Sequence, residues 1–160
     1  MNKMLQSNCR VLALPKIVFA VLALLLLRPT CAAGAEDFMK KAQTAIGAKT
    51  FPSGLVYRSL QDGTGPHPNL KSIVVLDYSA TSPKLGTFDD SNRIGRPLSI
   101  TLGRATKCWQ LGLALMQPGG HAILTCPAEL AYGAAGTAKI PPNEPIQFEV
   151  HLLQILGSHD

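Results

Sequence analysis

The sequence predicts an α+β domain in which a curved antiparallel β-sheet wraps around one short α-helix. From Phe51 onward the chain consists of short runs rich in β-branched residues, separated by glycine and proline. The last run, 146–156, alternates apolar and polar residues, which is typical of a strand with one buried face. Between the strands, "CWQLGLALM" has the apolar density of a helix and stops at "QPGG". Several antiparallel strands that share one helix give this fold class.

The elements follow from local patterns in chain order. The expected strands are 54–60, 72–80, 97–103, 120–126 and 146–156. The second of them, "SIVVLDYSA", is rich in β-branched residues, so we expect it at the centre of the sheet. A short helical leader is expected over 36–50, because apolar residues recur there at a weak helical spacing. The main domain is then 51–160.

The N-terminal segment 1–35 has the pattern of a secretory signal peptide. Three basic residues precede the apolar run 17–27, and the small residues of "CAAGA" follow it, so cleavage is expected after Ala33 or Ala35. The apolar run is shorter than the roughly 20 residues that a permanent membrane span needs. We therefore expect an exported protein, in a periplasm first and in a secretory lumen or the extracellular space as alternatives. An uncleaved anchor is the remaining alternative, with membrane contact through this segment alone.

Charge and cysteine content change when that segment is removed. Four of the 15 basic residues lie in it, which leaves 11 against all 10 acidic residues, so the domain is near neutral and no nucleic-acid partner is expected. Cys9 and Cys31 leave with it, and Cys108 and Cys126 remain. In an exported protein these two cysteines pair or stay as two separately buried thiols, and the pattern alone leaves both alternatives open.

The sequence contains no convincing metal site and no motif for covalent catalysis. The four histidines are scattered, and neither a G-x-S-x-G motif nor a phosphate-binding loop is present. We therefore expect no metal and no cofactor. What remains is an aromatic and apolar set with one carboxylate: Tyr78, Phe88, Asp89, Trp109, Tyr132, Ile140 and Phe148. Tyr132 is the strongest functional candidate of this set, because its loop, "AYGAAGTAKIPP", offers little core for an aromatic side chain to join.

Five motifs resemble, in this order and spacing, those of FKBP-type peptidyl-prolyl cis-trans isomerases. They are "VLDYSA", "TFDDS", "RPLSITLG", "CWQLGLALMQPGGHAILTCPAELAYG" and "IPPNEPIQFEVHLLQI", and the resemblance covers about 53–156. The preceding stretch, "FMKKAQTAIGAKTFPSGLVYRSLQDGTGP", is similar to the entry of exported bacterial members of the macrophage infectivity potentiator type, with a shortened N-terminal arm. The family's FKBP-like fold agrees with the fold class predicted from the pattern.

The resemblance also implies roles for individual residues. Trp109 is expected to begin the helix and to form the floor of a substrate pocket. The Tyr132 hydroxyl and the Thr106 backbone N–H are expected to donate to substrate carbonyl groups, and Asp89 is expected to act as a polar anchor. The wall and rim residues that bind substrate are then Tyr78, Phe88, Leu98, Ala105, Ile140 and Phe148.

The segment "ATKCW" departs from the family patterns "VIPGW" and "VIRGW". Ala105 and Thr106 replace two apolar residues, and Cys108 replaces a glycine. Less apolar area around a twisted amide predicts an activity lower by about ten-fold, from about 25 cal/mol per Å² of lost surface. Cys108 is also expected to pair with Cys126, whose strand is expected beneath the helix.

The resulting hypothesis is a peptidyl-prolyl cis-trans isomerase that assists the folding of exported proteins. Its expected substrates are Xaa-Pro bonds of unfolded or folding polypeptides, and macrolide ligands of the FKBP type are a further class that the resemblance implies. The alternative is a catalytically weak FKBP-like chaperone or a proline-peptide binding module. Retained peptide affinity without rate enhancement would distinguish that alternative.

Overall fold

The computed structural model describes residues 30–157, and side chains from residue 34 onward. The predicted signal segment lies almost wholly outside the described residues. The elements are α2 (Thr30–Gln43), β1 (Ala48–Thr50), β2 (Val56–Gln61), β3 (Ile73–Ser82), β4 (Gly86–Asp90), α3 (Ser91–Ile94), β5 (Leu98–Thr101), the 3-10 turn η1 (Leu102–Arg104), α4 (Lys107–Leu113), β6 (His121–Cys126), the 3-10 turn η2 (Ala128–Leu130) and β7 (Ile146–Leu156). Residues from 33 onward belong to one compact unit.

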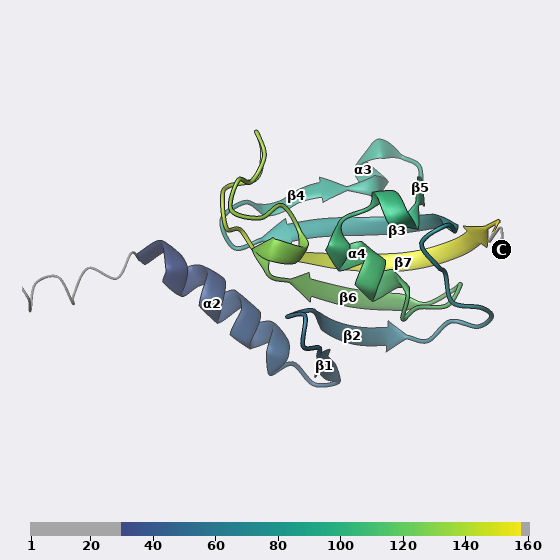
Figure 1. Cartoon of the computed structure of the whole chain (residues 1–160), viewed down its shortest axis with the longest axis horizontal. Helices are drawn as coiled ribbons and strands as arrows, with labels where there is room; N and C mark the ends of the chain where they lie inside the picture. The colour runs from purple at the N-terminus through teal and green to yellow at the C-terminus, as the bar shows by residue number, and fades with distance from the viewer. Residues whose placement is uncertain (1–29, 158–160) are drawn as a thin grey trace, which may run out of the picture. The chain divides into compact units, whose positions relative to one another are not determined.

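The strands form one antiparallel sheet in the order β1-β2-β6-β7-β3-β4, with β5 also beside β3 (Figure 1). β3 pairs with three strands. Along one edge, its first half pairs with β5 and its second half with β4; along the other edge it pairs with β7 over almost its whole length. The prediction of a central strand at 72–80 is therefore confirmed, as is the α+β fold class with an antiparallel sheet.

The alternation along β7 separates the two faces of the sheet. Ile146, Phe148, Val150 and Leu152 are buried, whereas the side chains between them are more exposed. β6 alternates in step, with Ala122, Leu124 and Cys126 fully buried. We call the side of the buried residues the pocket face and the other side the outer face. The period of two thus directs one set of side chains into the core and the other toward α2 or solvent.

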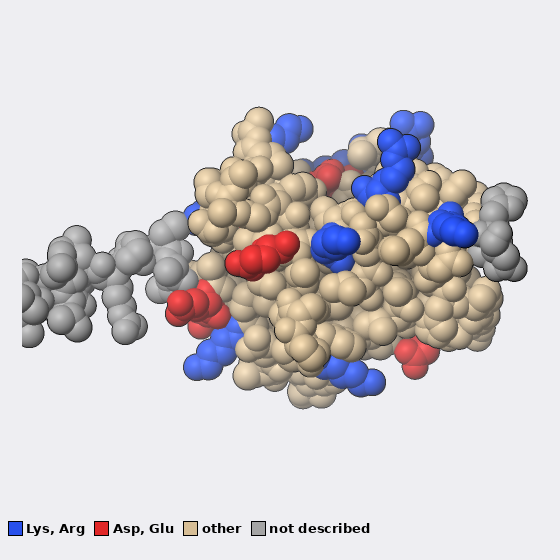
Figure 2. Space-filling model, viewed as in Figure 1, with Lys and Arg blue, Asp and Glu red and all other residues tan. Residues whose placement is uncertain are grey.

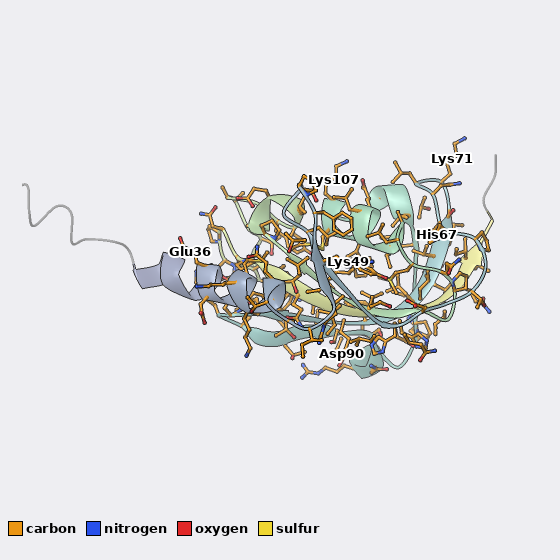
Figure 3. All side chains as sticks on the ribbon, turned by 90° about the horizontal axis from the view of Figure 1, so that it is seen from below. Glu36, Lys49, His67, Lys71, Asp90 and Lys107 are labelled. Carbon is orange, nitrogen blue, oxygen red and sulfur yellow. A yellow bond between two sulfur atoms is a disulfide. The ribbon has the colours of Figure 1, made fainter. Side chains whose placement is uncertain are left out.

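Helix α4 packs on the pocket face, over β6. Figures 1 and 3 show it against one side of the sheet, and Lys107 at its start lies on the opposite side from Asp90, at the end of β4. Gly112 faces β6, and a Cβ atom there would clash with the Leu124 side chain. A glycine at this position therefore allows the short helix to approach the sheet closely and to bury Leu113 completely.

Two local predictions need correction. The leader helix does not extend to residue 50: α2 ends at Gln43, a turn with Gly47 at φ 80° follows, and β1 pairs with β2 from Ala48 onward. Pairing with β2 gives these backbone groups partners that a fraying helix end would lack. Helix α4 ends at Leu113, earlier than the "QPGG" stop. Strand β4 and helix α3 were not foreseen; Asp90 caps α3, because its carboxylate accepts from the Asn92 N–H at 2.8 Å.

The surface carries charges of both signs. Figure 2 shows them spread over a mostly uncharged face of the molecule. Within residues 30–157, none of the helices has the length and apolar character required to cross a membrane.

Candidate functional site

Three aromatic side chains form the centre of a cavity on the pocket face. The Trp109 ring, in the first turn of α4, meets the Tyr78 ring at 5.2 Å and 76° and the Phe148 ring at 5.5 Å and 79°. These edge-to-face contacts are the arrangement that aromatic quadrupoles favour. Trp109 is only 6% exposed, so it is the floor, and Tyr78 from β3 and Phe148 from β7 stand beside it.

The cavity has a volume of about 250 Å³. Its lining is mainly aromatic and aliphatic, with few polar side chains: Tyr78, Ala80, Phe88, Asp89, Leu98, Ile100, Arg104, Ala105, Thr106, Trp109, Tyr132 and Phe148. Concave, mostly apolar sites with a few placed polar groups are typical of binding sites for organic ligands.

Asp89 is the one carboxylate of this lining, and it is paired with an aromatic wall. The Tyr78 hydroxyl donates to Asp89 Oδ2 at 2.8 Å, while Asp89 Oδ1 accepts from the Asp90 N–H at 3.0 Å. Burial raises the pKa of Tyr78 above the ordinary tyrosine value, and this hydrogen bond raises it further. Asp89 thus holds the Tyr78 ring in the wall and keeps its proton in place.

Tyr132 projects from the loop between η2 and β7. The loop closes on itself through hydrogen bonds from Gly133 N–H to Ala128 O at 2.7 Å and from Gly136 N–H to Tyr132 O at 3.1 Å. Gly136 has φ 62°, and a Cβ atom there would clash with the Ile140 carbonyl oxygen, so the tight turn requires glycine. Tyr132 is 37% exposed as a residue. Burial raises the pKa of its hydroxyl, and the charge of Asp89 raises it further. Its hydroxyl therefore remains a donor at neutral pH.

Thr106 immediately precedes α4 and occupies the N-cap position. Its carbonyl oxygen accepts from the Gln110 N–H at 3.0 Å, but its side chain makes no capping hydrogen bond. Thr106 Oγ1 and Trp109 Nε1 are both buried without a hydrogen-bond partner among residues 34–157. Two residues that line the pocket thus each hold a buried donor without a protein partner.

The start of α4 is bonded covalently to the sheet. Cys108 and Cys126 form a disulfide with a Cα–Cα distance of 5.9 Å, and both residues are completely buried. The pattern of the sequence left this pairing open against two free thiols. Because Cys108 adjoins Trp109, the bond joins the pocket floor to β6.

Nine of the ten residues expected in the pocket line it. Ile140, which was expected at the rim, is the exception: it is not among the lining residues, and its side chain is buried in the core. Three lining residues were missed. Ala80 lies two positions after Tyr78 on β3, and Ile100 lies two positions after Leu98 on β5. The period of two along a strand could therefore have found both. Arg104 is the last residue of the 3-10 turn η1 and has no such signal.

Glu144 was also missed, although it anchors the loop that carries Tyr132. Its side chain is buried, and Oε1 accepts from the Lys84 N–H at 2.9 Å while Oε2 lies 3.4 Å from Lys84 Nζ. The carboxylate thus connects the end of this loop to the β3–β4 turn. The residue was missed because its neighbours in the sequence, "PPNEPI", are typical of an ordinary solvent-exposed loop.

Known proteins share both the sequence and the fold. A family model described as FKBP-type peptidyl-prolyl cis-trans isomerase matches residues 65–153. The isomerase FkpA of Escherichia coli K12 is 38% identical over 120 residues, which cover 75% of this chain and 44% of that protein. The isomerase Mip of Coxiella burnetii is 34% identical over 119 residues, which cover 74% of this chain and 52% of that protein. The chain thus spans about half the length of these curated relatives.

Solved structures agree with this result. The crystal structure of Escherichia coli FkpA superimposes with a TM-score of 0.77 and 31% identity, covering 91% of this chain and 75% of that one. The structure of a peptidyl-prolyl cis-trans isomerase from Pseudomonas syringae pv. tomato superimposes with a TM-score of 0.72 and 30% identity. The match covers 81% of this chain and 97% of that one. With the aromatic pocket, the family match and these structures taken together, the chain belongs to the FKBP-type peptidyl-prolyl cis-trans isomerase family.

Proposed function

We propose that this protein is a peptidyl-prolyl cis-trans isomerase that acts on Xaa-Pro bonds of unfolded or folding polypeptides. The observation that carries the proposal is the Trp109 floor with Tyr78 and Phe148 edge-on beside it. A flat indole between two aromatic edges accommodates a proline ring without requiring polar partners that the ring lacks.

The chemistry needs no covalent step. Rotation about an Xaa-Pro bond crosses roughly 18 to 20 kcal/mol, because twisting the amide destroys its resonance. A twisted amide is less dipolar than a planar one, so an apolar cavity disfavours the planar ground state relative to the twisted transition state. The lining by Trp109, Phe88 and Phe148 supplies such a cavity.

Polar groups at the rim hold the flanking chain. We propose that the Tyr132 hydroxyl and the Thr106 backbone N–H donate to substrate carbonyl oxygens. The raised pKa of Tyr132 supports its role as a donor, since the phenol keeps its proton over the physiological range. Asp89 acts as the polar anchor, both for the Tyr78 wall and for a substrate N–H.

The smaller wall residues predict reduced activity. Ala105 and Thr106 line the cavity where the family patterns have two apolar residues that would contact more of the substrate. The loss of two aliphatic contacts is equivalent to about 1 to 2 kcal/mol at about 25 cal/mol per Å², which is about ten-fold in rate. This feature also favours the second candidate function, a proline-peptide binding module or chaperone with little turnover.

We further propose that residues 1–35 are a signal peptide and that residues 36–160 work outside the cytoplasm, in a periplasm first. The basic flank, short apolar run and small residues of the sequence support this assignment. One relative, which is 30% identical, is named outer membrane protein MIP of Legionella longbeachae. Proline-containing chains in transit are then the partners, and macrolides of the FKBP type are candidate ligands of the same cavity.

The test is the cis-to-trans exchange rate of a short Leu-Pro peptide with the purified protein. We expect acceleration that falls strongly in Trp109→Ala and by a smaller factor in Tyr132→Phe, which removes only the hydroxyl. Circular dichroism of each variant controls for folding. Peptide binding without acceleration would overturn the enzyme and favour the binding module, and neither binding nor acceleration would overturn both.

A further inference from the structure

We propose that the side-chain hydroxyl of Thr106 is a substrate-binding group, which donates a hydrogen bond to a carbonyl oxygen in the chain flanking the proline. The inference rests on the proposed function and deepens it, because it adds to the pocket a donor that the family patterns "VIPGW" and "VIRGW" lack at this position.

The first step is that the hydroxyl is buried and unpaired. Thr106 Oγ1 and Trp109 Nε1 have no hydrogen-bond partner within the described side chains, and both residues line the same cavity. They stand three positions apart at the start of α4, a spacing that places them on one side of the helix. Buried polar atoms in proteins are nearly always paired, so two exceptions in one cavity indicate a ligand with an acceptor group.

The second step is that local structure does not account for the hydroxyl. A threonine at an N-cap normally satisfies a free N–H of the first helical turn. Here the Thr106 side chain makes no capping hydrogen bond, and the following N–H groups of α4 gain nothing from it. The hydroxyl therefore gives nothing to the helix, and it belongs to a residue that lines the cavity.

The third step is that a proline peptide offers the matching group. The nitrogen of an Xaa-Pro amide carries no hydrogen, so the segment around it presents carbonyl acceptors in excess of N–H donors. A hydroxyl beside the Trp109 floor complements that excess, and it would do so next to the Thr106 N–H already assigned to the flanking chain. The bond is made to the flanking chain in ground state and transition state alike, so it strengthens binding and leaves the chemical step unchanged.

The experiment compares Thr106→Val, which keeps the shape and removes the hydroxyl, with Thr106→Ser, which keeps the hydroxyl. Thr50→Val, at an exposed position on the edge strand β1, is the matched control. All are made in the full chain. Affinity for a Leu-Pro peptide is measured from the fluorescence of Trp109, which is the sole tryptophan of the sequence, and KM and kcat are measured by peptide exchange.

For Thr106→Val we expect KM and the peptide Kd to rise roughly two- to ten-fold, the size of one neutral hydrogen bond, with kcat little changed. Thr106→Ser and Thr50→Val should bind as the wild type does. The urea midpoint of Thr106→Val should equal or exceed that of the wild type, because a group without a protein partner is removed. A structural hydroxyl would instead lower that midpoint and leave Kd unchanged.

Unchanged Kd and KM in Thr106→Val would overturn the inference, and so would a serine variant as weak as the valine variant. A wild type that binds the peptide but does not accelerate exchange would overturn the proposed enzyme alone, since the Kd comparison still decides the role of the hydroxyl. A wild type that binds no Leu-Pro peptide would overturn both.

Discussion

Strands β3 and β7 carry the aromatic pocket on one face and a polar hollow on the other. On the outer face the hollow has a volume of about 360 Å³ and is lined by polar side chains that include Asp77, His121, Glu149 and His151. It is at least as large as the pocket and much richer in titratable groups. By number of polar side chains alone, it would be the better candidate for a site.

The two regions differ in whether their polar groups are satisfied. In the outer hollow His121 Nε2 lies 2.9 Å from Glu149 Oε1, and the Ser91 hydroxyl donates to Asp77 Oδ1 at 3.1 Å. Among the described residues, no group of three or more His, Cys, Asp or Glu side chains is placed to hold a metal ion. Among residues 34–157, two residues of the pocket lining each hold a buried donor without a hydrogen-bond partner. Unpaired groups beside an apolar wall distinguish a binding site better than a count of polar residues does.

The largest expected effect concerns the disulfide under the pocket face. Replacing Cys108 and Cys126 together by alanine should lower the free energy of unfolding by about 3 kcal/mol, because a bridge across 18 residues restricts the unfolded chain. Urea denaturation measures this change. Wild-type protein under a reducing agent is the control and should lose a similar amount. Equal midpoints for oxidised and reduced protein would show that the pocket floor does not depend on this bond.

The next effect concerns Phe148, which lies on the pocket face of β7 beside Glu149 of the outer face. Phe148→Leu keeps an apolar side chain in the core but removes the edge-to-face contact with Trp109, a loss of about 1 kcal/mol. We expect weaker peptide binding, a lower rate of isomerisation and a shift in Trp109 fluorescence. Binding and emission identical to the wild type would contradict the assignment of Phe148 to the pocket wall.

A smaller effect is expected in alkaline solution. Burial is the main cause that raises the pKa of all three tyrosines, Tyr57, Tyr78 and Tyr132, in the folded protein. Above pH 10 the unfolded chain has released protons that the native protein still holds, so stability is fully present below about pH 10 and falls as the pH rises further.

Absorbance at 295 nm measures that ionisation. The native protein should show little phenolate at pH 10, where the chain in concentrated urea is about half ionised. Coincident titration curves in the two solvents would contradict the burial of these hydroxyl groups.

The smallest effect is expected on the outer face. Glu149→Gln alters the 2.9 Å contact between the Glu149 carboxylate and His121 Nε2. Because both side chains are partly exposed, stability should change by less than about 0.5 kcal/mol. Peptide exchange should be unaffected, which makes this variant the control for Phe148→Leu. A loss of activity here would mean that the outer face takes part in function and that the distinction between the two regions is wrong.

The sequence by itself determined the elements whose pattern is local. The alternation from Ile146 to Leu152 defined β7 and its buried face, and the β-branched run of β3 predicted a central strand. Strand β4 was missed, because "GTFDD" is short and contains glycine and two aspartates, residues that disfavour strands. Strand β1 was missed because its three residues are held by pairing with β2 and not by their own propensity.

The candidate site divides in the same way. Residue types and motif order were sufficient to place Trp109 and Tyr132 in the lining of the pocket, because both depend on a recognisable neighbourhood in the chain. The burial of Ile140, the anchoring of the rim by Glu144 and the unpaired hydroxyl of Thr106 depend on which atoms surround them in space. Hydrogen-bond satisfaction is a property of three-dimensional neighbours, so only the tertiary structure decided it.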